Sequence, residues 1–224
     1  MIIAVHQPNY LPYLGFFDKM EKADIFVIYD NAQFSKEDYH HRNRVRIFNG
    51  WKWLTVPVEK KRIPINQIMV VNSSSTKEEN KWNHKHLRVI SDNYKNAPFY
   101  EDYIDAFYKI YEKEYCSLCE LNMDLILLLK EAFDIGTEIL YTSDLGQLSS
   151  SSQGLVEIVQ KVDGDTYLSG QGGKNYLDIS LFKDKGIKVD FQNYVHPIYK
   201  QCYEGFVPYM SAIDALFNTG KLPI

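Results

Sequence analysis

The fold is decided by the opening stretch MIIAVHQPNYLPYLGFFDKMEKADIFVIYD, residues 1–30. Residues 1–7 form an apolar run typical of a buried strand, and residues 13–23 carry apolar side chains at roughly helical spacing. A second apolar run follows at residues 23–30. Strand, helix and strand in this order indicate the βαβ unit of a parallel sheet. Residues 4–17 then lie at the carboxyl end of the first strand, where open α/β sheets bind their ligands.

The same alternation resumes late in the chain, after a long helical stretch between residues 81 and 130. The pattern predicts strands at 137–145, 165–170 and 187–194, a serine-capped helix at 149–162 and a short helix at 178–186. Residues 52–60 and 65–72 are predicted to be a pair of strands, either exposed or joined as a hairpin. We expect an α/β, Rossmann-like three-layer domain with a mainly parallel sheet, in which residues 1–224 form a single domain with a helical insertion at about 77–135.

The composition is that of a folded globular protein, with 45% hydrophobic and 24% charged residues. A formal net charge of −4 argues against general nucleic-acid binding. The longest apolar run, LILLL, is too short to cross a bilayer, so we expect no membrane span and a cytoplasmic location. The 17 tyrosines suit a surface that holds sugars, nucleotides or another protein, or they simply cover helices.

The three cysteines do not indicate a metal or redox site. Cys116 and Cys119 have the spacing of a metal pair, but they lie in a leucine pattern of helical period. A tetrahedral site would need two more ligands, and the sequence has no second cysteine pair. We therefore predict no metal ligands, and the sequence leaves the cofactor unknown.

The first candidate motif follows the first strand. Pro8 and Pro12 force the chain to leave that strand as a rigid extended loop, and Gly15 allows close backbone approach near the start of the next helix. This arrangement favours an anion at the positive end of the helix dipole. The alternative is that these side chains only bind neighbouring loops. The side chains expected to point into the crevice are His6, Gln7, Asn9 and Tyr10.

The second motif, YDNAQFSKEDYHHRNRVR at residues 29–46, begins at the end of the second strand. Residues 36–62 carry eight basic and three acidic side chains, an excess that can receive a phosphate. Since adjacent histidines in extended chain point to opposite faces, at most one of His40 and His41 faces the crevice. The alternative is a solvated basic edge strand. The candidates here are Asp30, Gln33, Lys36, His41, Arg42, Asn43 and Arg44.

The third motif, YLSGQGGKNYLD at residues 167–178, follows a late strand. Its glycines can cradle a phosphate, although their spacing is that of neither a P-loop nor a dinucleotide fingerprint, and a plain flexible turn is the alternative. Its candidates are Ser169, Gly170, Gly172 and Lys174. We expect one pocket to unite His6, Gln7, Asp30, Gln33 and Gly170, with Arg42 or Arg44 at its rim.

The remaining histidines carry weaker signals. His84 and His86 are two residues apart on a predicted helix, so they do not share a face, and we expect both at the surface. His196 lies in an aromatic segment, residues 193–218, that could close over the crevice or build a contact between copies of the chain.

Three stretches together carry a family resemblance: HQPNYLPYLGFFDKM at 6–20, DNAQFSKEDYHHRNRV at 30–45 and SAIDALFN at 211–218. The chain resembles the WbqC-like family of bacterial proteins over essentially its whole length. The resemblance implies a setting in the biosynthesis of surface polysaccharide, that is, the O-antigen of lipopolysaccharide. It implies no defined reaction.

A remoter likeness concerns the strand followed by QP and LG, which resembles the opening of nucleotidyltransferases and adenylating ligases with an HxGH motif. In those enzymes, imidazoles meet nucleotide phosphates at the start of the first helix. Leu14, Gly15 and Phe16 retain the glycine but neither histidine, so a shared architecture does not extend to this chemistry.

These observations support three hypotheses. The preferred one is a group transferase that modifies an amino or hydroxyl group of a nucleotide-linked sugar, with His6 as general acid or base. Gln7 and Tyr10 would orient the substrate, and Asp30 is a further catalytic candidate. The alternatives are a non-catalytic module that binds a sugar nucleotide or a partner enzyme, and an ATP-dependent adenylating ligase. In the preferred hypothesis the phosphate, or another phosphate-bearing small molecule, meets Lys36, Arg42 and Arg44.

Overall fold

The computed structural model describes residues 1–59, 61–72 and 81–223. They form two compact units. The first, here called the sheet unit, comprises Met1–Gln7, Gly15–Asn31 and Ile135–Val195. The second, the helical unit, comprises Pro8–Leu14, Ala32–Asp134 and His196–Ile224. The single-domain organisation expected from the sequence stays a prediction.

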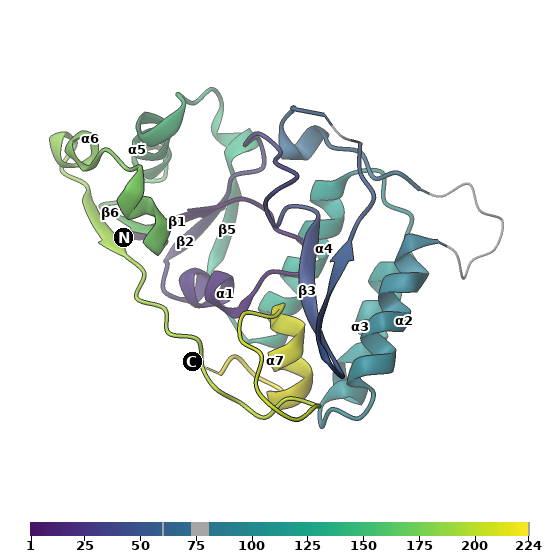
Figure 1. Cartoon of the computed structure of the whole chain (residues 1–224). Coiled ribbons are helices and arrows are strands. Elements are labelled where there is room, and N and C mark those ends of the chain that lie inside the picture. The colour runs from purple at the N-terminus through teal and green to yellow at the C-terminus, as the bar shows by residue number, and fades with distance from the viewer. Residues whose placement is uncertain (60, 73–80, 224) are drawn as a thin grey trace. The chain divides into compact units, whose positions relative to one another are not determined.

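The sheet unit is built on a five-stranded sheet in which every pair of neighbouring strands is parallel (Figure 1). The strand order is β5-β2-β1-β6-β7. The predicted α/β fold with a parallel sheet is confirmed. The strands are β1 (Ile2–His6), β2 (Ile25–Ile28), β5 (Glu138–Tyr141), β6 (Thr166–Ser169) and β7 (Lys188–Phe191), and the helices are α1 (Leu14–Glu21), α5 (Ser151–Lys161) and α6 (Ile179–Asp184).

Alternating side chains of the central strands bury the two faces of this sheet. On one face, Val5 and Val27 belong to a cluster with Val156 and Val159 of α5. On the other face, Phe16 of α1 contacts Phe26 of β2, with ring centroids 5.1 Å apart. Helices therefore cover both faces, and the predicted three-layer arrangement is confirmed.

The strand order places a topological switch point beside β1. The chain extends the sheet from β1 through β2 to β5, and then crosses over to add β6 and β7 on the other side of β1. In open α/β sheets the connections that follow the strands at such a point diverge, which leaves a crevice at their carboxyl ends. The ends of β1 and β6, at His6 and Ser169, mark that position in this unit.

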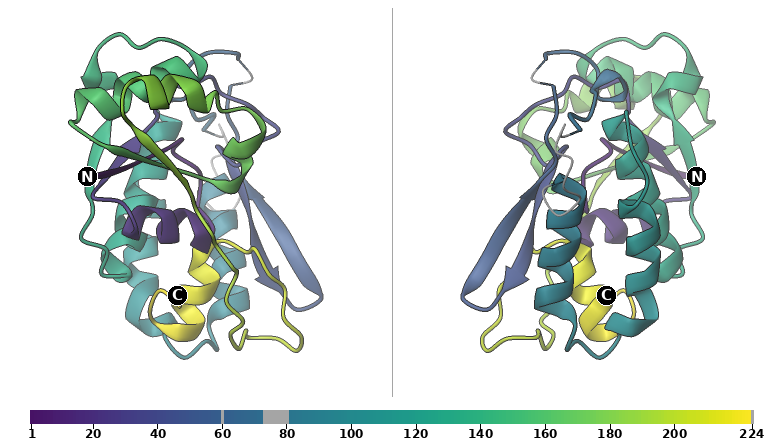
Figure 2. Two further views of the ribbon diagram at one scale, coloured as in Figure 1. Left: turned by 90° about the vertical axis from the view of Figure 1, so that its left-hand side faces the viewer. Right: turned by 90° about the vertical axis from the view of Figure 1, so that its right-hand side faces the viewer.

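The helical unit contains most of the helices predicted between residues 81 and 130. Figure 2 shows the yellow helix α7 packed with α3 and α4 of this unit. The predicted insertion contains three helices between residues 82 and 132, separated by residues 95–99 and 112–117, while residues 77–80 lie outside the described part of the chain. The helices are α2 (Trp82–Tyr94), α3 (Tyr100–Tyr111), α4 (Leu118–Ala132) and α7 (Ala212–Thr219), and the strands are β3 (Arg42–Ile47) and β4 (Gly50–Thr55).

The predicted pairing of residues 52–60 with 65–72 is found only around Val58 and Val70, which form an antiparallel bridge. Strand β4 pairs with β3 in an antiparallel hairpin, closed by the two residues Phe48 and Asn49. Residues Ile65–Gln67 form a 3₁₀ turn, and on either side of the bridge Glu59 N donates to the carbonyl oxygen of Met69 at 3.0 Å and Val71 N to that of Pro57 at 2.8 Å. A two-residue connection costs less chain entropy than the longer loop, and Pro57 and Pro64 each lack the N–H that a ladder needs. Lys60, at the end of the predicted strand, lies outside the described residues.

Candidate functional site

A cavity of about 480 Å³ lies in the sheet unit at the carboxyl ends of β1 and β6. Its place is the switch point defined by the strand order. The lining comprises Val5, His6, Gln7, Lys19, Tyr29, Ser151, Ser152, Leu155, Tyr167, Ser169, Gly170, Gly172, Gly173 and Tyr176. None of these lining side chains is acidic, and Lys19 is basic.

His6 enters the cavity as the last residue of β1. Its Nδ1 atom lies 3.0 Å from the carbonyl oxygen of Gln7, and its ring meets the edge of Phe16 at 4.8 Å. Because a carbonyl oxygen only accepts hydrogen bonds, Nδ1 carries the proton in this contact. Nε2 is then the nitrogen through which the neutral ring exchanges a proton.

Lys19 reaches the cavity from the last turn of α1. The side chain is buried, at 4% exposure, and Nζ donates a hydrogen bond to the carbonyl oxygen of Val5 at 2.8 Å. Burial lowers the pKa of this amine from 10.5 to about 7. The amine therefore changes its charge near neutral pH.

The glycine-rich segment after β6 forms another part of the cavity lining. Ser169 Oγ donates to the carbonyl oxygen of Gly170 at 3.0 Å, and residues Gln171–Asn175 form a 3₁₀ turn. A Cβ atom on Gly173 would lie 2.1 Å from Ser169 Oγ, whereas a Cβ on Gly172 would meet nothing within 4 Å. The close approach of Ser169 to the turn therefore requires glycine at position 173.

The start of α5 closes the cavity, with Ser151 and Ser152 in its lining. The first backbone N–H groups of a helix have no partner within the helix and favour an anion. The predicted capping by a serine side chain is not found at the start of α5. The N-cap residue is Ser150, but its side chain makes no capping hydrogen bond. Ser149 instead donates through its backbone N and its Oγ to the carboxylate of Glu157, at 2.7 and 2.6 Å.

Part of the predicted convergence is present within the sheet unit. Two of the candidates predicted in the first motif and three of those predicted in the third line one cavity, namely His6, Gln7, Ser169, Gly170 and Gly172.

Three other predicted residues of this unit do not line the cavity. The carboxylate of Asp30 accepts hydrogen bonds from Thr142 Oγ1 at 2.9 Å and from the backbone N of Ser143 at 3.0 Å. The carbonyl oxygen of Gly15 accepts from Gln192 Nε2 at 2.8 Å. The ammonium of Lys174 lies over the ring of Phe191, 5.3 Å from its centroid. In the structure, these residues join loops and helices to the sheet.

Sequence reasoning missed several groups in the lining, above all Lys19, the two serines of α5 and Tyr176. One signal was available for Lys19. It follows Phe16 by three residues and precedes Ala23 by four, so it lies on a helix face with apolar, buried neighbours. A single cation on such a face indicates a buried functional or structural amine.

Gln33 and Lys36, from the second motif, line a different pocket of about 450 Å³ within the helical unit. Lys61 and Arg62 also line it, but acidic side chains offset part of this charge. Lys61 pairs with Glu59 at 2.6 Å, and Lys36 Nζ lies 3.8 Å from a carboxylate oxygen of Glu37. The positive potential of this pocket is therefore reduced.

The arginines of the second motif lie on β3. Arg42 stacks on Trp53 at 4.8 Å and donates to the carbonyl oxygen of Glu37, and Arg44 lies 5.2 Å from the centre of Trp51. Neither lines the pocket of Gln33 and Lys36, so the expected rim position is not found in this unit. The stacking favours the alternative of a charged hairpin strand.

His41 is partly buried against the ring of Phe34, at a centroid distance of 5.4 Å. Burial, with the nearby Arg42 and His40, lowers the pKa of His41 to about 4. The imidazole is therefore neutral at pH 7 and adds no positive charge for a phosphate.

The expectation that Tyr10 points into a crevice is wrong, because its side chain is fully buried in the helical unit. Its hydroxyl lies 2.8 Å from Nδ1 of His86 and also bonds the hydroxyl of Tyr111. Asn9 is buried as well, and Asn43 donates through Nδ2 to the carbonyl oxygens of Tyr10 and Leu11. The two prolines fold this loop into a core.

The surface position expected for His86 is also wrong. The residue is only 7% exposed, and its ring packs against Trp82 at 5.3 Å. Burial lowers the pKa of His86 to about 3, so the ring stays neutral and bonds Tyr10. His84, two residues earlier, is partly exposed. The two residues thus lie on different faces of α2, as their spacing predicts.

Fold and site together define a Rossmann-like α/β protein with a polar, acid-free cavity at the switch point of its parallel sheet. The model of the WbqC-like protein family matches residues 7–223, and the chain belongs to this family. A relative from Mycobacterium tuberculosis, "Uncharacterized protein Rv1507c", is 31% identical over 220 residues, which cover 97% of this chain and 94% of the relative. No solved structure matches the chain.

Two negative findings apply to residues 1–59, 61–72 and 81–223. None of the helices there combines the length and apolar character that crossing a bilayer requires. Within the same ranges, no group of three or more His, Cys, Asp or Glu side chains is arranged to hold a metal ion.

Proposed function

We propose that this protein is a cytoplasmic enzyme of bacterial surface-polysaccharide biosynthesis, a group transferase that acts on a nucleotide-linked sugar. The biological setting rests on the resemblance to the WbqC-like family. The ligand class rests on one observation, the cavity at the ends of β1 and β6, whose lining contains no acidic side chain.

Several properties of the cavity suit a sugar nucleotide. Its volume of about 480 Å³ lies in the range of small-molecule sites. Lys19 and the start of α5 supply positive charge for the two phosphates, and the serines supply hydrogen bonds. Tyr176, 70% exposed at the lining, offers an aromatic face for the base or the sugar.

His6 is the residue we assign to proton transfer. With Nδ1 bonded to the Gln7 carbonyl oxygen, Nε2 accepts the proton of the attacking hydroxyl or amino group. The nucleophile then bonds to the transferred group as that group's bond to its donor breaks. Gln7, beside His6 in the lining, orients the sugar through its amide.

The experiment combines ligand binding with product detection. Nucleotide-linked sugars are screened for a rise in melting temperature, since a ligand bound only by the native state at a hundredfold its Kd adds roughly 2.7 kcal/mol. The protein is then incubated with the best ligand and candidate donors, and products are identified by mass spectrometry. His6→Ala should lower turnover by roughly 10²- to 10⁴-fold. His84→Ala, in the helical unit, is the matched control.

The alternatives give different results in the same experiment. Undiminished turnover of His6→Ala at saturating substrate would remove His6 from the chemistry. Binding without any product would favour a non-catalytic module. Release of pyrophosphate from ATP with a candidate acid would favour an adenylating ligase, which the chain's departure from the HxGH pattern argues against.

A further inference from the structure

Lys19 is a buried cation without an acidic partner among the residues that the structure describes. The neighbouring carboxylate, Asp18, is engaged elsewhere: it pairs with Lys22 at 2.6 Å and accepts from Gln192 Nε2 at 2.6 Å. The contacts of the Lys19 ammonium are the carbonyl oxygen of Val5 and the ring of Phe26, 6.0 Å from its centroid. A carbonyl and a ring stabilise a positive charge only in part.

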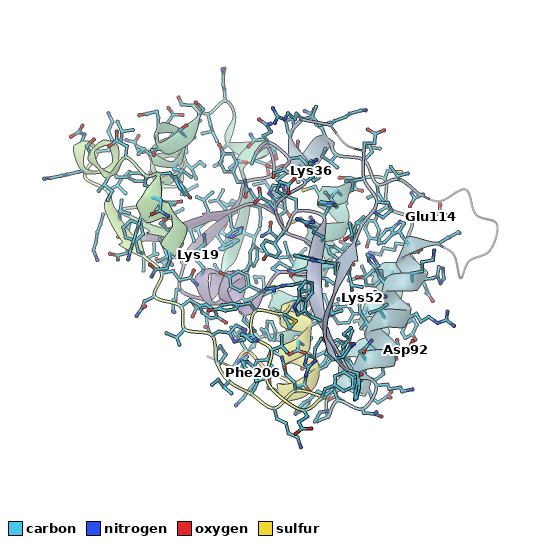
Figure 3. The ribbon with its side chains drawn as sticks, viewed as in Figure 1. Lys19, Lys36, Lys52, Asp92, Glu114 and Phe206 are labelled. Atoms are coloured by element: carbon cyan, nitrogen blue, oxygen red, sulfur yellow. The ribbon has the colours of Figure 1, made fainter. Side chains whose placement is uncertain are left out.

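The free energy of burying the Lys19 ammonium depends on whether an anion occupies the cavity. Burying an uncompensated charge is costly, and an anion at hydrogen-bond distance offsets the cost. Figure 3 labels Lys19 between α1 and the strands above it in that view. Because Lys19 lines the cavity, an anion that enters there lies close to this side chain.

The other titratable groups around Lys19 do not supply that anion. His6 of β1, Tyr29 after β2 and Tyr167 of β6 share the cavity with it. Burial raises the pKa of both tyrosines, so they stay neutral. Asp18, on the same helix, is held by Lys22 and Gln192.

We propose that the Lys19 amine binds the diphosphate of the ligand as an ammonium, and that it takes up a proton when the ligand binds at pH values above neutrality. The identity of the ligand as a sugar nucleotide rests on the proposed function, whereas the phosphate site itself rests on Lys19 and its cavity. Since burial lowers the pKa of Lys19 to about 7, the empty cavity holds mainly the neutral amine at pH 8. A bound phosphate favours the charged form.

Isothermal calorimetry with UDP-glucose tests the proton uptake. The phosphates of this probe keep a constant charge between pH 6 and 9, so any proton taken up is released by the buffer and bound by a group of the protein. Heats measured at pH 8 in two buffers of different ionisation enthalpy should show uptake of close to one proton. At pH 6, where the amine already carries its proton, uptake at Lys19 should be close to zero.

Two variants test whether the affinity and the proton uptake depend on Lys19. Lys19→Met should lower the affinity for UDP-glucose and for inorganic pyrophosphate by roughly tenfold or more, the size of a lost charge-assisted hydrogen bond, and should abolish the uptake at pH 8. Lys22→Met removes the same charge from the same helix at a side chain outside the cavity lining, and should change the affinity less than twofold. Circular dichroism checks that both variants fold.

The outcomes separate the two proposals. Equal affinities of wild type and Lys19→Met, or no proton uptake by wild type at pH 8, would overturn the role of Lys19 while leaving sugar-nucleotide binding in place. Binding of pyrophosphate through Lys19 without binding of UDP-glucose would support the phosphate site and count against the ligand class. If neither probe binds the wild-type protein at 10 mM, a concentration of the order of weak millimolar binding, both proposals fail.

Discussion

Tyr94 and Asp214, 120 residues apart in the chain, are joined by a hydrogen bond of 3.0 Å in the interior of the helical unit. Asp214 is completely buried, and it also accepts from Tyr199 at 2.7 Å and from Gln201 at 2.8 Å. Three donors thus converge on one carboxylate of the SAIDALFN stretch. This relationship gives a structural role to a motif that the sequence could only associate with the family.

Replacing Asp214 by Asn should therefore destabilise the protein. The amide keeps the shape, but its NH₂ group faces donors, so at least one buried hydrogen bond is lost and a donor is left unsatisfied. We expect a loss of roughly 2–4 kcal/mol in the free energy of unfolding, measured by urea denaturation. Asp92→Asn, at an exposed position of α2, is the control. Equal stability of the two variants would contradict the buried network.

Lys19→Met should change how stability depends on pH. The pKa of Lys19 is about 7 in the folded protein and 10.5 when unperturbed, so between these values the unfolded chain binds more protons. Below pH 7, burial of the charged amine lowers the free energy of unfolding by its full amount. As the pH rises above 7, this loss decreases by roughly 1.4 kcal/mol per pH unit. The variant should exceed wild type in stability most at pH 6.5 and progressively less at pH 8 and 9.

Denaturation curves of wild type, Lys19→Met and Lys22→Met at these pH values provide the measurement. Lys22 is about half exposed and pairs with Asp18, so Lys22→Met should follow wild type with a nearly constant offset. A stability difference between wild type and Lys19→Met that does not change with pH would contradict the lowered pKa.

A pair of glycine variants tests the packing of the turn after β6. A Cβ atom at position 173 would lie 2.1 Å from Ser169 Oγ and 2.9 Å from Leu177 Cδ1, so Gly173→Ala should cost roughly 1–3 kcal/mol of stability. At Gly172 there is open space, and Gly172→Ala should stay within about 0.5 kcal/mol of wild type. Thermal or urea unfolding measures both. Similar effects of the two substitutions would show that the close contact with Ser169 is not a constraint.

Local patterns were sufficient to predict the sheet. The βαβ opening and the late strands follow from apolar runs of strand length, and the parallel pairing follows from the helices between them. The partner of residues 50–55 was not predicted, because residues 42–47 carry three arginines and their pattern fits a loop as well as a hairpin strand. In the structure, Arg42 and Arg44 stack on the tryptophans of β4, a cross-strand contact that no single segment reveals.

The part of the candidate site that lies at the ends of strands could be predicted from the sequence. His6 is the last residue of β1 and Gly170 follows β6, and a parallel sheet brings such positions to one edge. The burial of Tyr10 was not predictable, because it depends on His86 and Tyr111, which are remote in the sequence. The hydrogen-bond partner of Lys19 was not predictable either, since a backbone carbonyl leaves no sequence signal, and only the apolar helix face around Lys19 indicated its burial.

The central claim is that the cavity at the ends of β1 and β6 binds the diphosphate of a sugar nucleotide. Its most direct test is a titration of the ¹⁵N-labelled protein with UDP-glucose, followed by the chemical shifts of the assigned backbone amides. The claim predicts the largest saturating shifts at Ser152, Gly170 and Gly173, and their loss in Lys19→Met. Saturating shifts concentrated instead at Lys36, Lys61 and Arg62, in the pocket of the helical unit, would contradict it.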